Sequence, residues 1–358
     1  MIREVDVVVV GAGQAGLSAA YFLRRHFEPG TGFAVLDHAP HAGGAWQFRW
    51  PTLTFKTVNG VYQLPGMPVP EPDAATPVAG VISAYFAAYE REFDLRVERP
   101  VSVRSVRSLP DKRLSIATDR GEWIAKALIN ATGTWERPFW PRYTGQGSFK
   151  GRQLHTAQYR GPEGFRGERV VVVGGGISAM QHLMEIHPVA AATTWVTRRE
   201  PQWRSGDFNP DRGREAVAMV EERVRRGLRP QSVISVTGVP LTPEIRAARE
   251  AGVLERHPMF DRIEPKGVAW NGGVNWNDGR FVPADTILWA TGFRAALDHL
   301  APLKLRGPGG GIVMDGTRVA ADPRIHLAGY GPSASTVGAN RAGRAAVREI
   351  REYLSRAA

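Results

Sequence analysis

The 358-residue sequence contains no cysteine. Disulfide frameworks, thiolate metal sites, iron–sulfur clusters and dithiol redox centres are therefore excluded. The sequence also lacks an apolar run of transmembrane length, and it has neither a G-x-S-x-G nor an H-E-x-x-H motif. We therefore predict neither a serine-nucleophile hydrolase nor a zinc hydrolase, and we expect no metal site.

Acidic residues are fewer than basic ones, 35 against 46, which gives a formal net charge of +11. The arginines are scattered, without a long basic run or interleaved aromatic residues, so we expect no nucleic-acid partner. An enzyme that binds two polyanionic cofactors itself needs some positive field. Because an apolar strand starts by residue 5, we predict no signal peptide and expect a cytoplasmic protein without a membrane partner. A homodimer stays an open alternative.

The first 37 residues follow a strand–turn–helix–strand pattern. Residues 5–10, VDVVVV, are typical of a parallel strand that is buried on both faces. The motif G-x-G-x-x-G follows at 11–16, then a helix-compatible segment at 17–27 and a second apolar run at 33–36. Asp37 follows that run directly. This order predicts a dinucleotide-binding unit.

Each part of this motif has a physical role. Gly11 permits a tight turn, Gly13 lets the backbone approach a pyrophosphate, and Gly16 lets the helix pack closely on the strand. The pyrophosphate would lie at the helix N-terminus. Asp37 would accept a hydrogen bond from a ribose 2′-hydroxyl.

A second copy of the pattern lies further along the chain. The apolar residues 170–173 lead into G-x-G-x-x-A at 174–179, followed by a predicted helix and strand. Arg198 and Arg199 then stand where the first unit has Asp37. A carboxylate suits a free 2′-hydroxyl and would repel a 2′-phosphate, whereas an arginine can pair with that phosphate through its planar fork.

This difference predicts two different adenosines. FAD in the first unit and NADPH in the second satisfy it most simply, with NADH as a weaker coenzyme. The alternative is that both arginines are solvated surface residues without a ligand.

The chain is predicted to leave the first unit and to return to it. Buried strands at 127–131 and 285–289 each run into Ala-Thr-Gly, and a returning strand is expected at 324–329 before a final helix to about residue 354. The predicted fold class is α/β, with two doubly wound, Rossmann-like domains and the NADPH domain inserted into the FAD domain. The predicted boundaries are 1–158 and 289–358 for the FAD-binding domain and 159–288 for the NADPH-binding domain.

The other expected elements follow from periodicity and turn residues. Helices are expected at 78–93, at about 215–226 and at 243–250. Short antiparallel strands are expected at 101–103, 113–116 and 122–124. A hairpin is expected at 270–279, with its turn at Asn277-Asp278-Gly279. Residues 205–265 otherwise show no clear pattern.

The segment between the two units carries F-x-G-x-x-x-H-x-x-x-Y, from Phe149 through His155 to Tyr159. Together with the second dinucleotide motif, it resembles the fingerprint of flavin-containing monooxygenases. GAGQAG, GGAW, both ATG segments, GGGISA and the C-terminal GYG extend the resemblance over nearly the whole chain. The length and Trp46 look most like the short bacterial members of these class B flavoprotein monooxygenases.

The motifs and the resemblance together give the candidate cofactor contacts. For FAD they are Gly11, Gly13, Gln14, Ala15, Gly16, Asp37, Gly44, Ala45, Trp46, Val103, Thr132, Gly133, Gly329 and Tyr330. For NADPH they are Gly174, Gly176, Ile177, Ser178, Ala179, Arg198, Arg199 and Thr291.

The resemblance also implies a mechanism. NADPH would reduce FAD by hydride transfer, and the reduced flavin would take up O2 as co-substrate to form a C4a-(hydro)peroxyflavin, which bound NADP+ shields from water. A small soft nucleophile, a sulfide or an amine, would then be oxygenated, and a deprotonated peroxide would instead attack a ketone. Baeyer–Villiger relatives usually end the fingerprint with Trp, so Tyr159 favours sulfides or amines over ketones.

The candidate catalytic residues are Lys56 and His155. Lys56 stands where many relatives have Asn near the flavin, and Asn59 is close by but off register. Lys56 would hydrogen-bond a peroxide or lie in solvent, and His155 would act chemically or shape the linker. The alternatives are a largely uncoupled NADPH oxidase, a Baeyer–Villiger-type ketone monooxygenase, a reductase for ferredoxin-like proteins, and a flavin-binding sensor that does not turn over.

Overall fold

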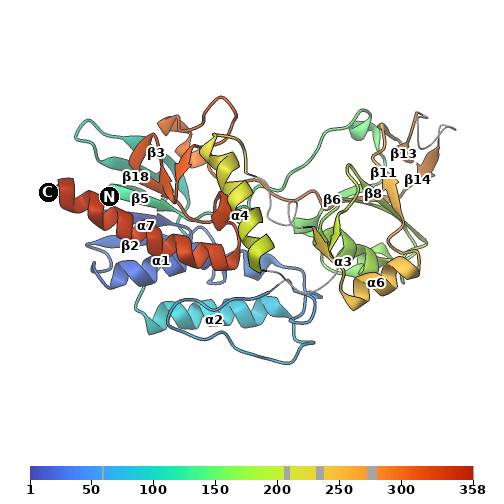
Figure 1. The fold of residues 1–358 in the computed structure, drawn as a ribbon, viewed down its shortest axis with the longest axis horizontal. Helices are drawn as coiled ribbons and strands as arrows, with labels where there is room; N and C mark the ends of the chain where they lie inside the picture. Colours follow the sequence, from blue (N-terminus) through green and yellow to red (C-terminus); the bar gives the residue numbers. More distant parts are fainter. Residues whose placement is uncertain (59, 205–209, 231–237, 272–279, 358) are drawn as a thin grey trace.

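The computed structural model describes residues 1–58, 60–204, 210–230, 238–271 and 280–357. Two larger sheets, each with its own helices, form two units (Figure 1). Crossing segments that follow residue 130 and residue 289 connect them. The N-terminal strand and the C-terminal helix both lie in the first unit.

The first sheet is built around β1 (Ile2–Val10), whose middle is fully buried. β1 pairs in parallel with β2 (Phe33–Leu36) on one side and with β5 (Gly121–Asn130) on the other. β5 in turn pairs in parallel with β18 (Asp322–Leu327). The returning strand therefore completes the sheet that the N-terminal strand begins, as predicted.

The remaining strands of this eight-stranded sheet are antiparallel, namely β3 (Val103–Ser108), β4 (Leu114–Thr118), β16 (Met314–Asp315) and β17 (Arg318–Val319). The sequence predicted two strands, at 122–124 and 127–131, where the structure has the single strand β5. The charged Lys126 lies between the two predicted strands. Its ammonium pairs with Asp6 of β1 at 2.8 Å, so the backbone pairing continues past it.

Three helices form the core on one face of this sheet. α1 (Gln14–Arg24) and α7 (Thr336–Ala357) lie side by side (Figure 1). They approach closely, because a Cβ on Gly343 of α7 would lie 2.8 Å from the backbone nitrogen of Ala19. α2 (Val78–Glu92) packs into the same core through its aromatic residues.

The second sheet is entirely parallel, with the order β11-β8-β7-β15-β6. Its strands are β6 (Arg152–His155), β7 (Arg169–Val173), β8 (Ala192–Thr197), β11 (Arg256–Pro258) and β15 (Thr286–Trp289). α3 (Ile177–Ile186) follows β7, and α6 (Pro243–Glu250) lies where the sequence predicted a helix. Strand, glycine turn and helix thus repeat in both units.

Two small sheets complete the inserted part. β9 (Trp203–Arg204) pairs with β10 (Val239–Pro240) in one of them. The other contains β12 (Arg262–Glu264), β13 (Gly267–Ala269) and β14 (Phe281–Pro283). The tip of the predicted hairpin, 272–279, lies outside the described residues.

The pairing of β6 bears on the predicted domain boundaries. β6 was placed in the first domain, but it pairs with β15 from Arg152 opposite Thr286 to His155 opposite Trp289. Trp289, placed in the returning part, is the last residue of β15. We therefore propose that the inserted domain begins before Arg152 and ends after Trp289.

α4 (Pro210–Arg225) belongs to the inserted stretch but lies against the first unit (Figure 1). Val224 is buried in the core that also contains Leu327 and Tyr330. A Cβ on Gly331 would lie 2.8 Å from Val224 Cγ2. The inserted stretch thus covers the segment that precedes α7.

Candidate functional site

The turn between β1 and α1 forms an open backbone cradle. Gly11 has φ of +97°, and a Cβ there would come within 2.7 Å of the Ala131 carbonyl oxygen. A Cβ on Gly16 would come within 1.8 Å of the Gly11 carbonyl oxygen. Around Gly13, by contrast, no atom of the described residues lies within 4 Å of such a Cβ. Gly11 and Gly16 serve close packing, whereas Gly13 borders free space.

The start of α1 is suited to an anion. Gly13 is the N-cap, and the described first turn has neither a side-chain cap nor an acidic residue. The first N–H groups and the positive end of the helix dipole are therefore available. Gly44, with φ of +50°, lies so close that its Cβ would be 2.7 Å from Gly13 Cα. The GGAW segment thus passes beside the cradle, and this arrangement fits the pyrophosphate of FAD.

Asp37 lies at the end of β2 and is buried, with 3% of its surface exposed. Arg99 donates to Asp37 Oδ2 at 3.3 Å and holds Glu90 through two further bonds of 2.5 and 2.8 Å. The Val101 N–H donates to the Asp37 carbonyl oxygen at 2.8 Å, which brings the start of β3, Val103, to the same edge. Asp37 Oδ1 faces only His38 among the described residues, at 3.8 Å, so it can still accept a ribose hydroxyl.

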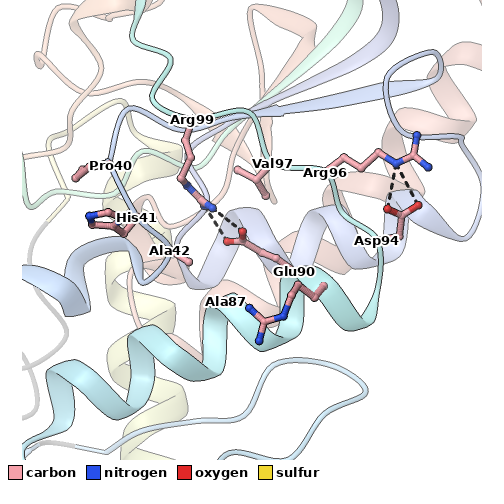
Figure 2. A pocket seen from close by; sticks show the side chains of 10 residues that line it. Pro40, His41, Ala42, Ala87, Glu90, Asp94, Arg96, Val97 and Arg99 are labelled. Atoms are coloured by element: carbon pink, nitrogen blue, oxygen red, sulfur yellow. Dashed lines mark hydrogen bonds and ion pairs between the residues drawn. The ribbon is translucent and has the colours of Figure 1, made fainter.

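A recess of about 670 Å³ adjoins this edge, and Arg99 lines it (Figure 2). Half of its lining residues are charged, and the others are mostly apolar. Figure 2 shows the ion pairs Arg99–Glu90 and Arg96–Asp94 within it. Every lining residue belongs to the first unit. A site where two dinucleotides meet must contact both units, so this recess is not the place where we expect oxygenation.

The second unit repeats the cradle. A Cβ on Gly174 would lie 2.2 Å from the Ala290 carbonyl oxygen, which parallels the approach of Gly11 to Ala131. No described atom lies within 4 Å of a Cβ on Gly176, which is the N-cap of α3 and has no side-chain cap. Ile177 and Ser178 form the partly exposed first turn, and Ala179 is buried below them. These residues fit a second pyrophosphate.

Arg198 and Arg199 directly follow β8, and both are exposed. Within the described part of the chain, no carboxylate pairs with either side chain. Thr197 fixes the strand end, because its hydroxyl donates to the Arg199 carbonyl oxygen at 2.7 Å and accepts from Arg256 Nε at 2.8 Å. Arg256 was not predicted, since it comes from β11 and no motif marks it. The arrangement leaves two guanidinium groups free for a 2′-phosphate.

The C-terminal GYG segment reaches the first cradle. A Cβ on Gly329 would lie 3.8 Å from Ala15 Cβ. Gln14 Nε2 donates to Asn340 Oδ1 at 2.9 Å, which ties the start of α1 to α7. Several predicted FAD contacts thus surround one turn, although the Tyr330 phenol itself is buried in the core of the first unit.

The threonines of the two Ala-Thr-Gly segments donate hydrogen bonds to backbone carbonyl oxygens of the segments that cross between the units. Thr132 Oγ1 donates to the Ala296 carbonyl oxygen at 2.7 Å. Thr291 Oγ1 donates to the Phe139 carbonyl oxygen at 2.5 Å. In this arrangement both hydroxyls order the backbone of the crossing segments.

Aromatic rings line the junction of the two units. Trp46 packs against the core around α1 and against the core around α3. Phe48 stacks on Trp135, and Trp135 stacks on Phe293 with ring centroids 4.9 Å apart. Trp135 and Phe293 were missed from sequence because each follows an Ala-Thr-Gly segment, outside the glycine motifs. Rings in this position would shield a reacting group that binds between the units from water.

Comparison with known proteins identifies the family. The family model described as pyridine nucleotide-disulphide oxidoreductase matches residues 8–251. A flavin-containing monooxygenase from Stenotrophomonas maltophilia has a TM-score of 0.81 and 38% identity, over 98% of this chain and 99% of that chain. The chain belongs to the class B flavin monooxygenases. Its cofactors, FAD and NADPH with O2 as co-substrate, are those of this family, as predicted.

Curated relatives match over shorter stretches. An uncharacterized oxidoreductase of Bacillus subtilis is 33% identical over 51% of this chain and 51% of its own length. A Baeyer–Villiger monooxygenase of Streptomyces coelicolor is 32% identical over 56% of this chain and 39% of its own length. The chain spans about half the length of the first curated oxidoreductases that it matches.

The monooxygenase fingerprint lies in the first crossing segment and β6. His155 is fully buried, its Nδ1 accepts from the Ala157 N–H at 3.1 Å, and its Nε2 therefore donates to the Gly292 carbonyl oxygen at 3.0 Å. Burial lowers the pKa of His155, which favours the neutral ring. Tyr159 donates to Glu185 at 2.7 Å. Both ring nitrogens of His155 are occupied, which favours its linker role over proton transfer.

Lys56 points to the second unit. Its ammonium lies 3.5 Å from Glu244 Oε1 on α6, and 63% of the side chain is exposed. The pair joins the loop after the GGAW segment to the NADPH-binding unit. Asn59 lies outside the described residues. A catalytic role of Lys56 stays a prediction.

The described residues contain no helix that is long and apolar enough to span a membrane. They also hold no group of three or more His, Asp or Glu side chains that would bind a metal ion.

Proposed function

We propose that this chain is an NADPH-dependent monooxygenase that transfers one oxygen atom of O2 to a small soft nucleophile, a sulfide or an amine. One observation carries the proposal. Two open glycine cradles, in units joined by the monooxygenase fingerprint, are followed by opposite charges, Asp37 in one unit and Arg198 with Arg199 in the other. A single chain thus offers a site for a 2′-hydroxyl adenosine and a site for a 2′-phosphate adenosine.

Bound FAD would accept hydride from NADPH and activate O2, so the reactive chemistry is the cofactor's. The protein would bind and orient the two dinucleotides through the cradles at Gly13 and Gly176. Arg99 would hold the Asp37 carboxylate in place for the FAD ribose. The rings of Trp46 and Trp135 would keep water from the junction.

The preference for sulfides or amines over ketones rests on Tyr159. Its hydroxyl donates to Glu185, and its ring packs against His182 with centroids 4.1 Å apart. Any influence on substrate choice would therefore act through the linker. Initial rates with a panel of sulfides, amines and cyclic ketones test the preference. Faster formation of lactones or esters than of sulfoxides would reverse it and favour the Baeyer–Villiger alternative.

A largely uncoupled NADPH oxidase is the second candidate, and the exposed position of Lys56 favours it. A side chain paired with Glu244 at the surface offers no protection to reduced flavin. Hydrogen peroxide formed per NADPH oxidised, with and without substrate, distinguishes the two activities. Location in the cytoplasm and self-association are proposed from sequence alone.

The cofactor assignment has a direct test. Purified protein should be yellow and release FAD on denaturation, and NADPH should bleach the bound flavin without oxygen. Recovery of FMN, or of no flavin after supplementation with FAD, would contradict the proposal. Bound flavin that NADPH leaves oxidised would instead indicate a sensor.

A further inference from the structure

The guanidinium of Arg49 has no hydrogen-bond acceptor among the residues that the structure describes. Its Nε is closed off from solvent and unbonded. The group lies between two indoles, with Cζ 4.7 Å from the ring centroid of Trp135 and 5.7 Å from that of Trp46. Burial lowers the pKa of Arg49 to about 10, so the group is still charged at neutral pH.

Arg3 provides the contrast. It lies over Trp123 at 4.3 Å in the same way, but it also pairs with Glu98 at 2.7 Å. Arg49 is half-buried, its Nε is closed off from solvent, and no carboxylate among the described residues pairs with it. A partly desolvated charge without an opposite charge is costly, because stacking on an aromatic face replaces only part of its hydration. An anion from outside the chain would supply the missing partner of Arg49.

The position of Arg49 limits which molecules could supply that anion. Arg49 directly follows the segment of Gly44 to Phe48, which begins beside Gly13, and Trp46 contacts the cores of both units. The pyrophosphates of the two dinucleotides already have uncapped helix N-termini, and a 2′-phosphate has the arginines after β8. An anion that pairs with Arg49 would therefore belong to a third molecule.

We propose that Arg49 binds an anionic oxygen group, a carboxylate or phosphate, of a small molecule that enters the junction of the units. Its source is the organic substrate, and this assignment of the source rests on the proposed monooxygenase function. The planar guanidinium would hold two oxygens of the group in a bidentate pair. The indoles of Trp46 and Trp135 would pack against the apolar body of the same molecule.

Binding to oxidised, FAD-loaded protein tests this without turnover. Phenylacetate, its neutral amide and NADP+ are titrated separately while tryptophan fluorescence and flavin absorbance are recorded. We expect saturable binding of phenylacetate to wild type. Arg49→Gln should weaken it about 10- to 100-fold, as for loss of a charge-assisted pair. Arg49→Lys should bind phenylacetate with an affinity between those of wild type and Arg49→Gln. The affinity for the neutral amide should hardly differ between wild type and the variants. Arg3→Gln is the matched control.

The other readouts separate the sources. Weaker binding of NADP+, or loss of FAD from purified Arg49→Gln, with phenylacetate unaffected, would support the anion site but assign it to a dinucleotide phosphate. The proposal would be overturned if Arg49→Gln and Arg3→Gln bind each of the three probes with the same affinity and contain the same amount of FAD. If Arg49→Gln does not fold, the same measurements are compared between Arg49→Lys, which keeps the positive charge, and Arg3→Gln. A protein that binds the carboxylate through Arg49 but oxygenates nothing would contradict only the proposed function.

Discussion

Two strand ends carry opposite charges at equivalent places. Asp37 is buried and held by Arg99 after β2, whereas Arg198 and Arg199 are exposed after β8 and have no carboxylate partner among the described residues. The buried acid can present a fixed oxygen to a ribose, and the exposed arginines can close on a phosphate. Coenzyme choice should therefore depend on single residues.

Arg198→Gln should erode the preference for NADPH. A hydrogen bond to a charged group contributes about 1.5–3 kcal/mol. Its loss should lower kcat/KM for NADPH by roughly 10- to 100-fold and leave that for NADH nearly unchanged. Arg199→Gln should have a weaker effect, and Arg246→Gln, at an exposed position on α6, serves as control. Steady-state kinetics with both coenzymes check this. An equal loss with both would indicate a packing defect, and a wild type that prefers NADH would refute the argument.

Some residues of the site could not be found from sequence. Arg99 pairs with an acid 62 positions away in the chain, and Arg49 stacks on a tryptophan that follows a different strand. Their meaning depends on which segments the sheet brings together. Glycine spacing and the acid after β2 were predictable, because a local turn needs particular residues at fixed positions. A long-range partner leaves no such local signal.

The glycine turn after β1 is the element on which we propose that FAD binding depends. Gly13 has φ of −85°, which any residue can adopt, and free space lies where its Cβ would point. Gly13→Ala should therefore fold normally but place a methyl group where we propose that the pyrophosphate binds.

We expect Gly13→Ala to bind FAD about tenfold or more weakly, with a Tm of the apoprotein close to that of wild type. Gly16→Ala should misfold instead, since its Cβ would lie 1.8 Å from the Gly11 carbonyl oxygen. Gly80→Ala, on the exposed side of α2, is the control. FAD content and thermal unfolding distinguish the three variants. Full FAD binding by Gly13→Ala would mean that the pyrophosphate binds elsewhere.

α3 carries a buried histidine that should make stability depend on pH. His182 lies between Trp50 and Tyr159, and neither ring nitrogen has a hydrogen-bond partner among the described residues. Burial lowers the pKa of His182 to about 3. Because the unfolded pKa is near 6.5, the unfolded state takes up the proton first as pH falls. The contribution of the neutral ring to the free energy of unfolding is fully present above about pH 6.5 and decreases toward pH 3.

At pH 5 the loss should be roughly 2 kcal/mol, at 1.36 kcal/mol per pKa unit. His182→Leu should therefore lose less stability than wild type between pH 7 and pH 5 in urea unfolding. His41→Asn, at an exposed position, should behave as wild type does. The same pH dependence in His182→Leu and wild type would mean that the ring is not buried neutral.

Element boundaries were predicted unevenly, for reasons that particular strands make clear. The valine run of β1 and the helix α6 were predicted because their own residues determine them. Residues 152–155 were assigned to the first domain and no strand was predicted there, because the pairing of β6 with β15 joins segments far apart in the sequence. Two strands were predicted in place of β5, since the Asp6 that pairs with Lys126 lies on another strand and leaves no local signal.

The whole molecule consists of two similar units that meet around the GGAW segment, the fingerprint and the Ala-Thr-Gly crossings. α4 and α7 tie the inserted stretch and the C-terminus to the first unit. This arrangement would place two dinucleotides in one chain, and the anion site proposed at Arg49 would add a third ligand at their junction. Its central consequence is that electrons from NADPH should end in an oxygenated product.

The most direct test is the fate of labelled oxygen. The enzyme is supplied with NADPH, 18O2 and a sulfide such as thioanisole, and the product, NADPH consumption and hydrogen peroxide are quantified together. We expect a sulfoxide that carries one 18O atom, formed in proportion to the NADPH oxidised. A product with oxygen from water, or NADPH oxidation matched entirely by hydrogen peroxide, would contradict it.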